Sequence, residues 1–191
     1  AGTLTLAGPG VNVLGAGEGS PNNSAVMNFG ATGGSPTQGL RSFNIVNGTV
    51  VLGAPGQTNT VLQTIIVGGE STTAAGAETA GHLVIDGGVF STPASLTVGR
   101  GNGTSVTAPG ELESSVRIND GKVSLGGLWL AAKLSDQTST ILTAKPLFEV
   151  NGGDVSTTTL YGGNNGGAPQ PQFVFNGGVT RVTGTASDAM R

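Results

Sequence analysis

The chain of 191 residues contains 35 glycines and no cysteine, and 8 basic against 11 acidic residues give it a formal net charge of −3. Hydrophobic residues still make up 36%, which argues against simple disorder, and the glycines follow no three-residue period with proline, which excludes a collagen helix. The small charge and the lack of an 18-residue apolar run lead us to expect no nucleic-acid partner and no membrane insertion, and the missing cysteines exclude a disulfide framework.

Residues 1–40 contain three short stretches of alternating apolar and polar residues between glycine-rich turns. Their period of two predicts strands at residues 3–6, 11–14 and 26–29. This region repeats less regularly than the rest of the chain, and we expect it to form an additional N-terminal coil or to supply a strand exchanged with a neighbouring copy. The residues that would mediate this self-assembly are Thr3, Leu4, Thr5, Leu6, Val11 and Val13.

From residue 41 to residue 191 one pattern recurs: an alternating apolar run, then Asn or Asp, then Gly, then a second alternating run. Glycine accepts a positive φ and Asn or Asp tolerates a left-handed conformation, so each such pair predicts a corner of the chain. We expect the five corners to lie above one another along a common axis. The anchors are Asn47, Asp86, Asp120, Asn151 and Asn176, and the glycines that turn with them are Gly48, Gly87, Gly121, Gly152 and Gly177.

Each anchor is followed by a short second strand, and a third strand recurs at residues 65–68, 96–99, 128–130 and 159–162. Alternation predicts that Phe43 and Ile45, like Phe173 and Phe175, point into the interior, while Asn44, Arg117 and Glu149 point outward. The pattern predicts one all-β domain over residues 1–191, a β-solenoid of about five or six coils. The alternative is an antiparallel β-sandwich of hairpins, because Asn-Gly and Asp-Gly also mark tight hairpin turns.

Two sequence features resemble a known group of proteins. Asn/Asp-Gly-Gly followed by Val recurs along the chain, and Gly-Thr-Leu-Thr-Leu-Ala-Gly at residues 2–8 is echoed by Leu-Thr-Val-Gly at residues 96–99. These segments resemble the β-strand repeats of bacterial autotransporter passenger domains and related large surface proteins. The resemblance implies a right-handed parallel β-helix, secretion by a bacterium, and a role as fibre, stalk or adhesin, and it brings no catalytic residue with it.

Our leading functional hypothesis is an extracellular structural protein, a subunit of a surface fibre or filament that assembles end to end. The first and last coils of a solenoid expose unpaired N–H and C=O groups, and a second copy stacked on either end would satisfy them. A chain without cysteine and rich in Thr, Ser, Asn and Gly fits a secreted location, either extracellular or at the cell surface. The expected partner is therefore another copy of the same chain.

An adhesin or glycan-binding module is the alternative. Trp129 and Tyr161 both fall on a third strand, and a period of two places Trp129 on the face opposite to Leu128 and Leu130. An outward aromatic side chain can act as a platform for a sugar ring. Under this hypothesis Trp129 and Tyr161 bind the ligand, and a glycan or a cell surface is the partner.

A polysaccharide lyase or hydrolase ranks third. Glu111 and Glu113 would share one face of a strand near Arg117, but a solvated loop rim explains them better and we expect no enzymatic activity. The single histidine, His82, has no second His or Cys with which to share a metal ion, so we expect a surface or strand-edge imidazole. No cofactor and no metal site is predicted.

Overall fold

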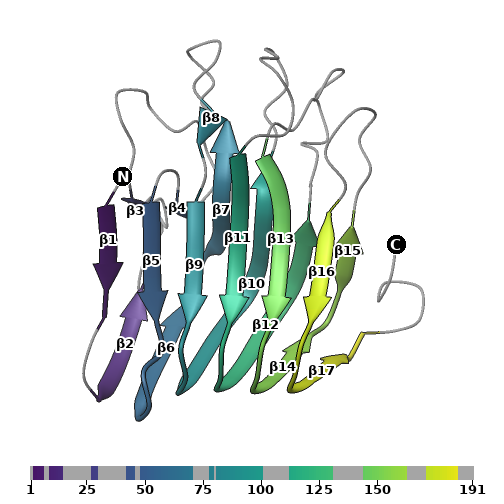
Figure 1. Ribbon diagram of the computed structural model, residues 1–191. Coiled ribbons are helices and arrows are strands. Elements are labelled where there is room, and N and C mark those ends of the chain that lie inside the picture. The colour runs from purple at the N-terminus through teal and green to yellow at the C-terminus, as the bar shows by residue number, and fades with distance from the viewer. Residues whose placement is uncertain are drawn as a thin grey trace, which may run out of the picture.

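The computed structural model describes residues 2–6, 9–14, 27–29, 42–45, 48–70, 78–79, 81–100, 112–130, 144–162 and 171–184. Within these ranges the chain forms strands β1 to β17 and no helix, so the protein is all-β (Figure 1). The strands belong to two sheets, which face each other across the hydrophobic core.

The first sheet takes one strand from each repeat. All of its neighbours pair in parallel, and its strands lie side by side in chain order across the front of Figure 1. In that order they are β1 (Gly2–Thr5), β5 (Gly48–Leu52), β9 (Gly81–Ile85), β11 (Leu112–Ile118), β13 (Ala144–Val150) and β16 (Gln172–Phe175).

The second sheet has two stretches, both parallel, which share the long strands β10 (Val89–Arg100) and β12 (Lys122–Leu130). The register of β10 with β12 shifts between Thr92 and Ser95, and this irregularity separates the two stretches. The first stretch also contains β2 (Gly10–Leu14), β6 (Gln57–Val61), β14 (Asp154–Thr157) and β17 (Val179–Val182). The second stretch also contains β3 (Met27–Phe29), β4 (Ser42–Ile45), β7 (Thr64–Glu70) and β15 (Leu160–Gly162).

Parallel pairing decides between the two fold hypotheses. Among the described strands, only β7 pairs in antiparallel fashion, with the short β8 (Glu78–Thr79). An antiparallel sandwich of hairpins would need neighbouring strands to run in opposite directions, so that alternative is wrong. The predicted third strands are confirmed, because Ile65, Leu96, Leu128 and Leu160 follow one another in register.

The N-terminal region forms strands as predicted. β1 pairs with β5, β2 with β6 and β3 with β4, all within the same chain and all in parallel. These strands therefore extend the first sheet and both stretches of the second sheet by one strand each. β1 and β3 are the first strands of their ladders, and β2 has only β6 as a neighbour among the described strands.

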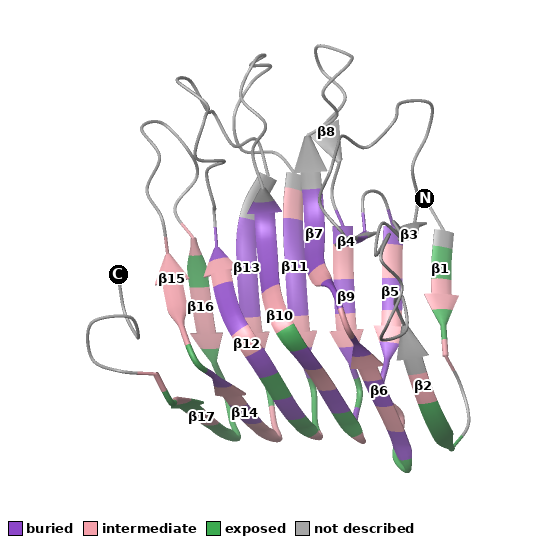
Figure 2. Ribbon diagram, turned by 180° about the vertical axis from the view of Figure 1, so that it is seen from behind, coloured by how far each residue is buried: buried purple, intermediate pink, exposed green. Residues whose placement is uncertain are grey.

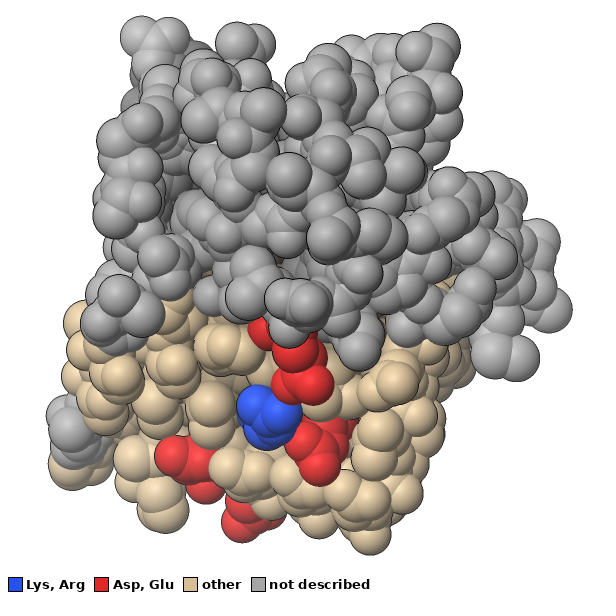
Figure 3. Space-filling view, turned by 45° about the horizontal axis from the view of Figure 1, so that its top comes forward, with Lys and Arg blue, Asp and Glu red and all other residues tan. Residues whose placement is uncertain are grey.

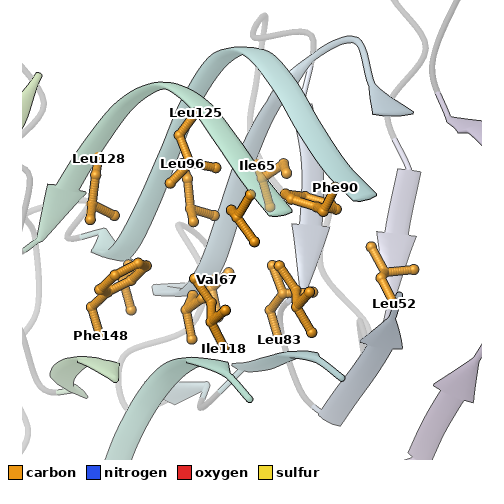
Figure 4. Close-up of a cluster of buried hydrophobic side chains, with 14 of the residues drawn as sticks. Leu52, Ile65, Val67, Leu83, Phe90, Leu96, Ile118, Leu125, Leu128 and Phe148 are labelled. Atoms are coloured by element: carbon orange, nitrogen blue, oxygen red, sulfur yellow. The ribbon is translucent and has the colours of Figure 1, made fainter. Parts of the chain in front are cut away.

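The core lies between the two sheets and is built by alternation. β5 and β9 bury every second residue (Figure 2). Leu83, Ile118 and Phe148 of the first sheet face Phe90, Leu96 and Leu125 of the second (Figure 4). The predicted inward positions Phe43 and Ile45 are confirmed at 2% and 0% exposure.

Phe175, which was also predicted to point inward, is 53% exposed. It follows Leu52, Ile85, Ile118 and Val150 in one column, a term we use for residues paired in register across successive strands. The four earlier members are fully buried, whereas Phe175 lies on β16, the last described strand of the first sheet. The alternation was predicted correctly, but burial also requires a strand on the far side.

Of the five corners that were predicted to stack, four do so, three of them at the predicted anchors. The four corners follow the first-sheet strands β9, β11, β13 and β16 and begin at Asp86, Asn119, Asn151 and Asn176. The backbone N–H of Asn119 donates to the carbonyl of Ile85, that of Asn151 to Ile118, and that of Asn176 to Val150, each at 2.8 Å. Successive corners are thus joined by backbone hydrogen bonds.

In the third repeat the prediction of Asp120 as the anchor is wrong by one residue. Ile118 pairs with Ile85, so the residue that stacks on Asp86 is Asn119. Asp120 instead accepts a 2.7 Å hydrogen bond at Oδ1 from the backbone N–H of Gly121. The register follows the last buried residue of the strand rather than the position of the glycine.

In the last two corners the glycine with a positive φ lies one residue later than predicted. Positive φ occurs in one column, at Gly88, Gly121, Gly153 and Gly178, so the predicted Gly121 is confirmed, whereas Gly152 and Gly177 do not share it. The predicted Gly87 also has a positive φ, of 155°. A Cβ at Gly152 would instead lie 2.5 Å from the carbonyl oxygen of Asn119. The close approach to the preceding corner therefore explains why residue 152 is a glycine, and the positive φ explains why residue 153 is a glycine.

Gly48 does not belong to this stack, contrary to the prediction. Asn47 lies outside the described residues, and Gly48 begins β5 and pairs with Gly81, at the opposite end of the first-sheet strands. The connection next to Asp86 follows Leu52, whose carbonyl accepts from Asp86 N at 3.3 Å. Phe43 and Ile45 mimic the motif in sequence, yet they pair with Ile65 and Val67 of the second sheet.

Candidate functional site

The stacked corners carry a ladder of polar side chains, which we call the corner ladder: Asp86, Asn119, Asn151 and Asn176. Asn119 Nδ2 donates to Asp86 Oδ1 at 2.7 Å, Asn151 Nδ2 to Asn119 Oδ1 at 3.0 Å, and Asn176 Nδ2 to Asn151 Oδ1 at 2.8 Å. Identical amides stacked in register bond to one another along the stack, as in other Asn ladders. The corner ladder therefore holds successive repeats in register, and its role is structural.

A second polar cluster lies on the outer face of the first sheet, around Arg117. Arg117 Nη2 donates to Glu113 Oε1 at 2.8 Å and Arg117 Nε donates to Glu149 Oε2 at 2.9 Å. On this face, basic atoms are surrounded by acidic ones (Figure 3). The predicted proximity of Glu113 to Arg117 is confirmed, as are the outward positions of Arg117 and Glu149. Glu111 lies outside the described residues.

His82 joins this cluster through Ser115. Its Nδ1 lies 2.8 Å from Ser115 Oγ, and Arg117 Nη1 donates to the same oxygen at 3.0 Å. Burial lowers the pKa of His82, the positive charge of Arg117 lowers it further, and the carboxylate of Glu113 opposes both. Because Ser115 Oγ accepts from Arg117, its hydroxyl can donate to Nδ1, which fits a neutral imidazole with its proton on Nε2.

The position of His82 differs in part from the expected surface or strand-edge imidazole. β9 has strand partners on both sides, and the His82 side chain is half-buried. Ser115, which the sequence did not single out, is buried at 1% exposure. Its hydroxyl is thus enclosed between His82 and Arg117, where it links their side chains. Among the described residues, no group of three His, Cys, Asp or Glu side chains is placed to hold a metal ion.

Trp129 and Tyr161 come together on the outer face of the second stretch of the second sheet. They are register partners on β12 and β15, with ring centroids 5.0 Å apart and planes inclined by 48°. Leu128 and Leu130, on either side of Trp129, are buried at 2% and 0% exposure. The predicted outward position of Trp129 is therefore confirmed, and both Trp129 and Tyr161 are partly exposed.

The terminal strands carry most of the exposed large hydrophobic side chains of the described residues. Val11 on β2 is 75% exposed, and Phe175 on β16 and Val179 on β17 are 53% and 47% exposed. Val89, at 39%, is the remaining one and lies within the second sheet. Of the residues predicted to mediate assembly, Leu4 and Leu6 pack against the core and Thr3 and Thr5 are exposed, while the side chain of Val13 lies outside the described set.

Register connects these terminal side chains. Val11, Thr58, Val89, Lys122, Asp154 and Val179 form a single column on the first stretch of the second sheet. On the first sheet, Thr5 pairs with Val51, which places Leu6 at the head of the column that ends at Phe175. Sequence reasoning missed Val179 and Phe175 because exposure of an apolar side chain on a terminal strand depends on the register of the whole stack.

No helix among the described residues is long and apolar enough to cross a membrane. Comparison of the chain with protein families, with curated proteins and with solved structures gave no match.

Proposed function

We propose that the chain is a right-handed parallel β-solenoid that serves as the structural subunit of an extracellular fibre, growing by end-to-end addition of further copies. In support of the winding, the chain passes from a first-sheet strand through both stretches of the second sheet and returns to the first sheet, as in β5, β6, β7 and β9. In Figure 1 the front strands run downward and the rear strands upward while the chain advances from left to right, the sense of a right-handed coil.

The observation that carries the proposal is the match between the two ends of the stack. If the last strands of one copy paired with the first strands of the next in continued register, Val179 would fall beside Val11 of the following copy. Phe175 would likewise fall beside Leu6. Phe175, in a column whose four earlier members are fully buried, would then be covered. Val11 and Val179 belong to an outward column, in which Val89 is 39% exposed between two paired strands, and they would be covered in part. Both contacts favour association through the hydrophobic effect.

Strand direction supports one polarity of assembly. β1 and β16 belong to one parallel ladder, and so do β2 and β17, so β16 and β17 of one copy would meet β1 and β2 of the next in parallel. This contact joins two different surfaces and leaves a new free end after each addition. Such a heterologous contact produces an open filament rather than a closed dimer.

The extracellular part of the proposal rests on composition. The chain contains no cysteine and only 10% charged residues, and it is rich in glycine, which suits a protein that folds outside the cell without disulfide formation.

The test is whether the 191-residue chain associates through these strands. Sedimentation velocity and negative-stain electron microscopy of the purified chain are expected to show linear assemblies that lengthen with concentration. Phe175→Lys is expected to abolish them, because the four earlier members of the Phe175 column are fully buried and the ammonium group would be enclosed beside Leu6. The matched control is Val179→Lys, in the outward column in which Lys122 is exposed, and this variant is expected to assemble. Discrete monomers of the unmodified chain, or filaments from Phe175→Lys, would contradict the proposal.

A further inference from the structure

The proposed contact between copies joins β16 and β17 to β1 and β2, whereas Trp129 and Tyr161 lie on β12 and β15, on the outer face of the second stretch of the second sheet. The pair is also separate from the polar cluster around Arg117, which lies on the outer face of the first sheet. Its function must therefore be sought apart from assembly.

The indole of Trp129 lies back along its own strand. A Cβ placed on Gly127, two residues earlier on the same face, would approach Trp129 Nε1 to 3.0 Å and Cδ1 to 3.6 Å. The five-membered edge of the indole thus occupies the space that a side chain at position 127 would need. Because Gly127 has no side chain, the indole can rest over the strand with its N–H edge above this glycine.

Tyr161 extends the surface onto the next strand. It pairs in register with Trp129, and the 5.0 Å between the ring centroids matches the spacing of adjacent strands, about 4.8 Å. On the preceding strand, the same column holds Thr97, whose side chain is buried at 7% exposure. The partly exposed part of the column therefore begins at Trp129 and continues through Tyr161.

Two described residues on the same face as the pair, Ser95 and Thr159, are polar and uncharged. Ser95 and Thr159 are partly exposed, and the Ser95 Cβ lies 3.8 Å from the position of a Cβ on Gly127. An aromatic surface with an indole N–H and a phenol hydroxyl at its rim, and with the hydroxyl-bearing Ser95 and Thr159 on the same face, fits a ligand that has an apolar flat face and a polar rim. Pyranose rings have this character, and the lack of charge on these neighbours selects neutral sugars over anionic ones.

We propose that Trp129 and Tyr161, with the indole placed by Gly127, form a binding site for a neutral glycan, whose pyranose rings stack on the aromatic pair. A chain of linked pyranose rings that runs across β12 and β15 would contact both aromatic rings at once. The site would lie on the side of a fibre and remain accessible after copies have joined at their ends.

The chain contains a single tryptophan, so its emission reports on this site directly. The probes are soluble neutral hexasaccharides of β-1,4-glucose, β-1,3-glucose, β-1,4-N-acetylglucosamine, β-1,4-xylose and β-1,4-mannose, with oligogalacturonate as the anionic control. At least one neutral oligosaccharide is expected to shift the emission of Trp129 saturably, and saturation-transfer NMR is expected to place its ring C–H groups against the protein. No saturable shift with any neutral probe would overturn the proposal, and so would equal binding of oligogalacturonate.

Three variants test the geometry. Trp129→Ala is expected to weaken binding at least tenfold by saturation-transfer NMR, and Tyr161→Ala to weaken it several-fold. Gly127→Ala keeps both rings but brings a methyl group against Nε1, and it is expected to weaken binding several-fold while circular dichroism and the unfolding midpoint change little. Phe175→Ala, which removes an exposed aromatic ring elsewhere, is the matched control and should bind normally. If Trp129→Ala does not fold, Gly127→Ala decides: unchanged binding by that variant would overturn the proposed placement.

Discussion

Asn151 donates a 3.0 Å hydrogen bond from Nδ2 to Oδ1 of Asn119, at the same place in the preceding corner. Asn151 also accepts at Oδ1 from Asn176, and Asn119 donates to Asp86, so each central amide serves both neighbours. An amide suits this position because it presents a donor and an acceptor on one flat group. Asp86, which only accepts when ionised, fits the first place in the ladder and would fit a central place less well.

The ladder predicts a difference between two adjacent substitutions. Asn119→Ala removes both of its ladder hydrogen bonds and is expected to lower the free energy of unfolding by about 1–2 kcal/mol. Asp120→Ala removes the hydrogen bond that Asp120 Oδ1 accepts from Gly121 N and is expected to cost about half as much. Urea unfolding followed by Trp129 fluorescence measures both. A larger loss for Asp120→Ala would mean that the anchor is Asp120 after all.

The environment of His82 predicts a pH dependence of stability. The pKa of His82 is lowered in the folded protein, by burial first and by Arg117 second, so below its ordinary pKa the unfolded chain binds a proton more readily. Stability from this group is therefore full above about pH 6.5 and falls as the pH drops toward the lowered value. Urea unfolding at pH 7.5 and pH 5.5 should show the loss. In His82→Gln the difference between the two pH values should shrink, and an undiminished difference would assign it to other groups.

Two charge substitutions should move the pKa of His82 in opposite directions. Arg117→Met removes the positive charge that lowers this pKa, so the pKa is expected to rise, and Glu113→Gln removes the carboxylate that raises it, so the pKa is expected to fall. The single histidine makes the NMR titration of the imidazole protons unambiguous. Shifts of the same sign in both variants would show that the charges act indirectly, through a change in the burial of His82.

Two phenylalanines allow the stability contributed by a core side chain to be compared with that of an exposed side chain on a terminal strand. Phe148 is fully buried, and Phe148→Ala is expected to lower the free energy of unfolding by about 3–5 kcal/mol. Phe175 follows the same alternation but is 53% exposed, so Phe175→Ala is expected to cost about 1 kcal/mol in the dilute monomer. Chemical denaturation at low protein concentration makes the comparison. Equal losses would indicate that Phe175 is covered in solution.

Charge complementarity can test the register of the proposed contact. Phe175→Lys and Leu6→Glu are each expected to block association, because each alone places a charge in a column that points into the core. An equimolar mixture of the two variants should associate, since a Lys–Glu contact and a Phe–Leu contact would alternate along the filament. Sedimentation velocity of each variant and of the mixture provides the readout. A mixture that stays monomeric would exclude this register without excluding association through another one.

Much of the architecture could be predicted from the alternation of residues. Strands, their inward faces and the recurring third strand follow from period two, and the outward position of Trp129 follows from the same rule. The strand register was harder to predict, because Phe43 and Ile45 precede an Asn-Gly pair just as Leu83 and Ile85 precede an Asp-Gly pair. Only the pairing of Val50 and Leu52 with Leu83 and Ile85 reveals which copy belongs to which sheet.

The candidate sites were predicted less completely, for two physical reasons. Contacts between Ser115 and His82, or between Glu149 and Arg117, join residues from different repeats, and a one-residue shift in register would separate them. The role of Gly127 depends on the rotamer of Trp129, which sequence periodicity does not determine. Aligning the last inward-facing residue of each strand, Ile85, Ile118, Val150 and Phe175, would have identified Asn119.

Each strand of the first sheet bonds only to the strands of the preceding and following repeats, so folding can be treated as a nearly one-dimensional process. A nucleus formed around β9 to β12 would extend outward one repeat at a time, and each step would close a loop about one repeat long. Fraying would start from the outermost strands, which have a single neighbour. A copy that docks on such a strand gives it a second neighbour, so every addition to a filament would also slow the unfolding of the molecule already in place.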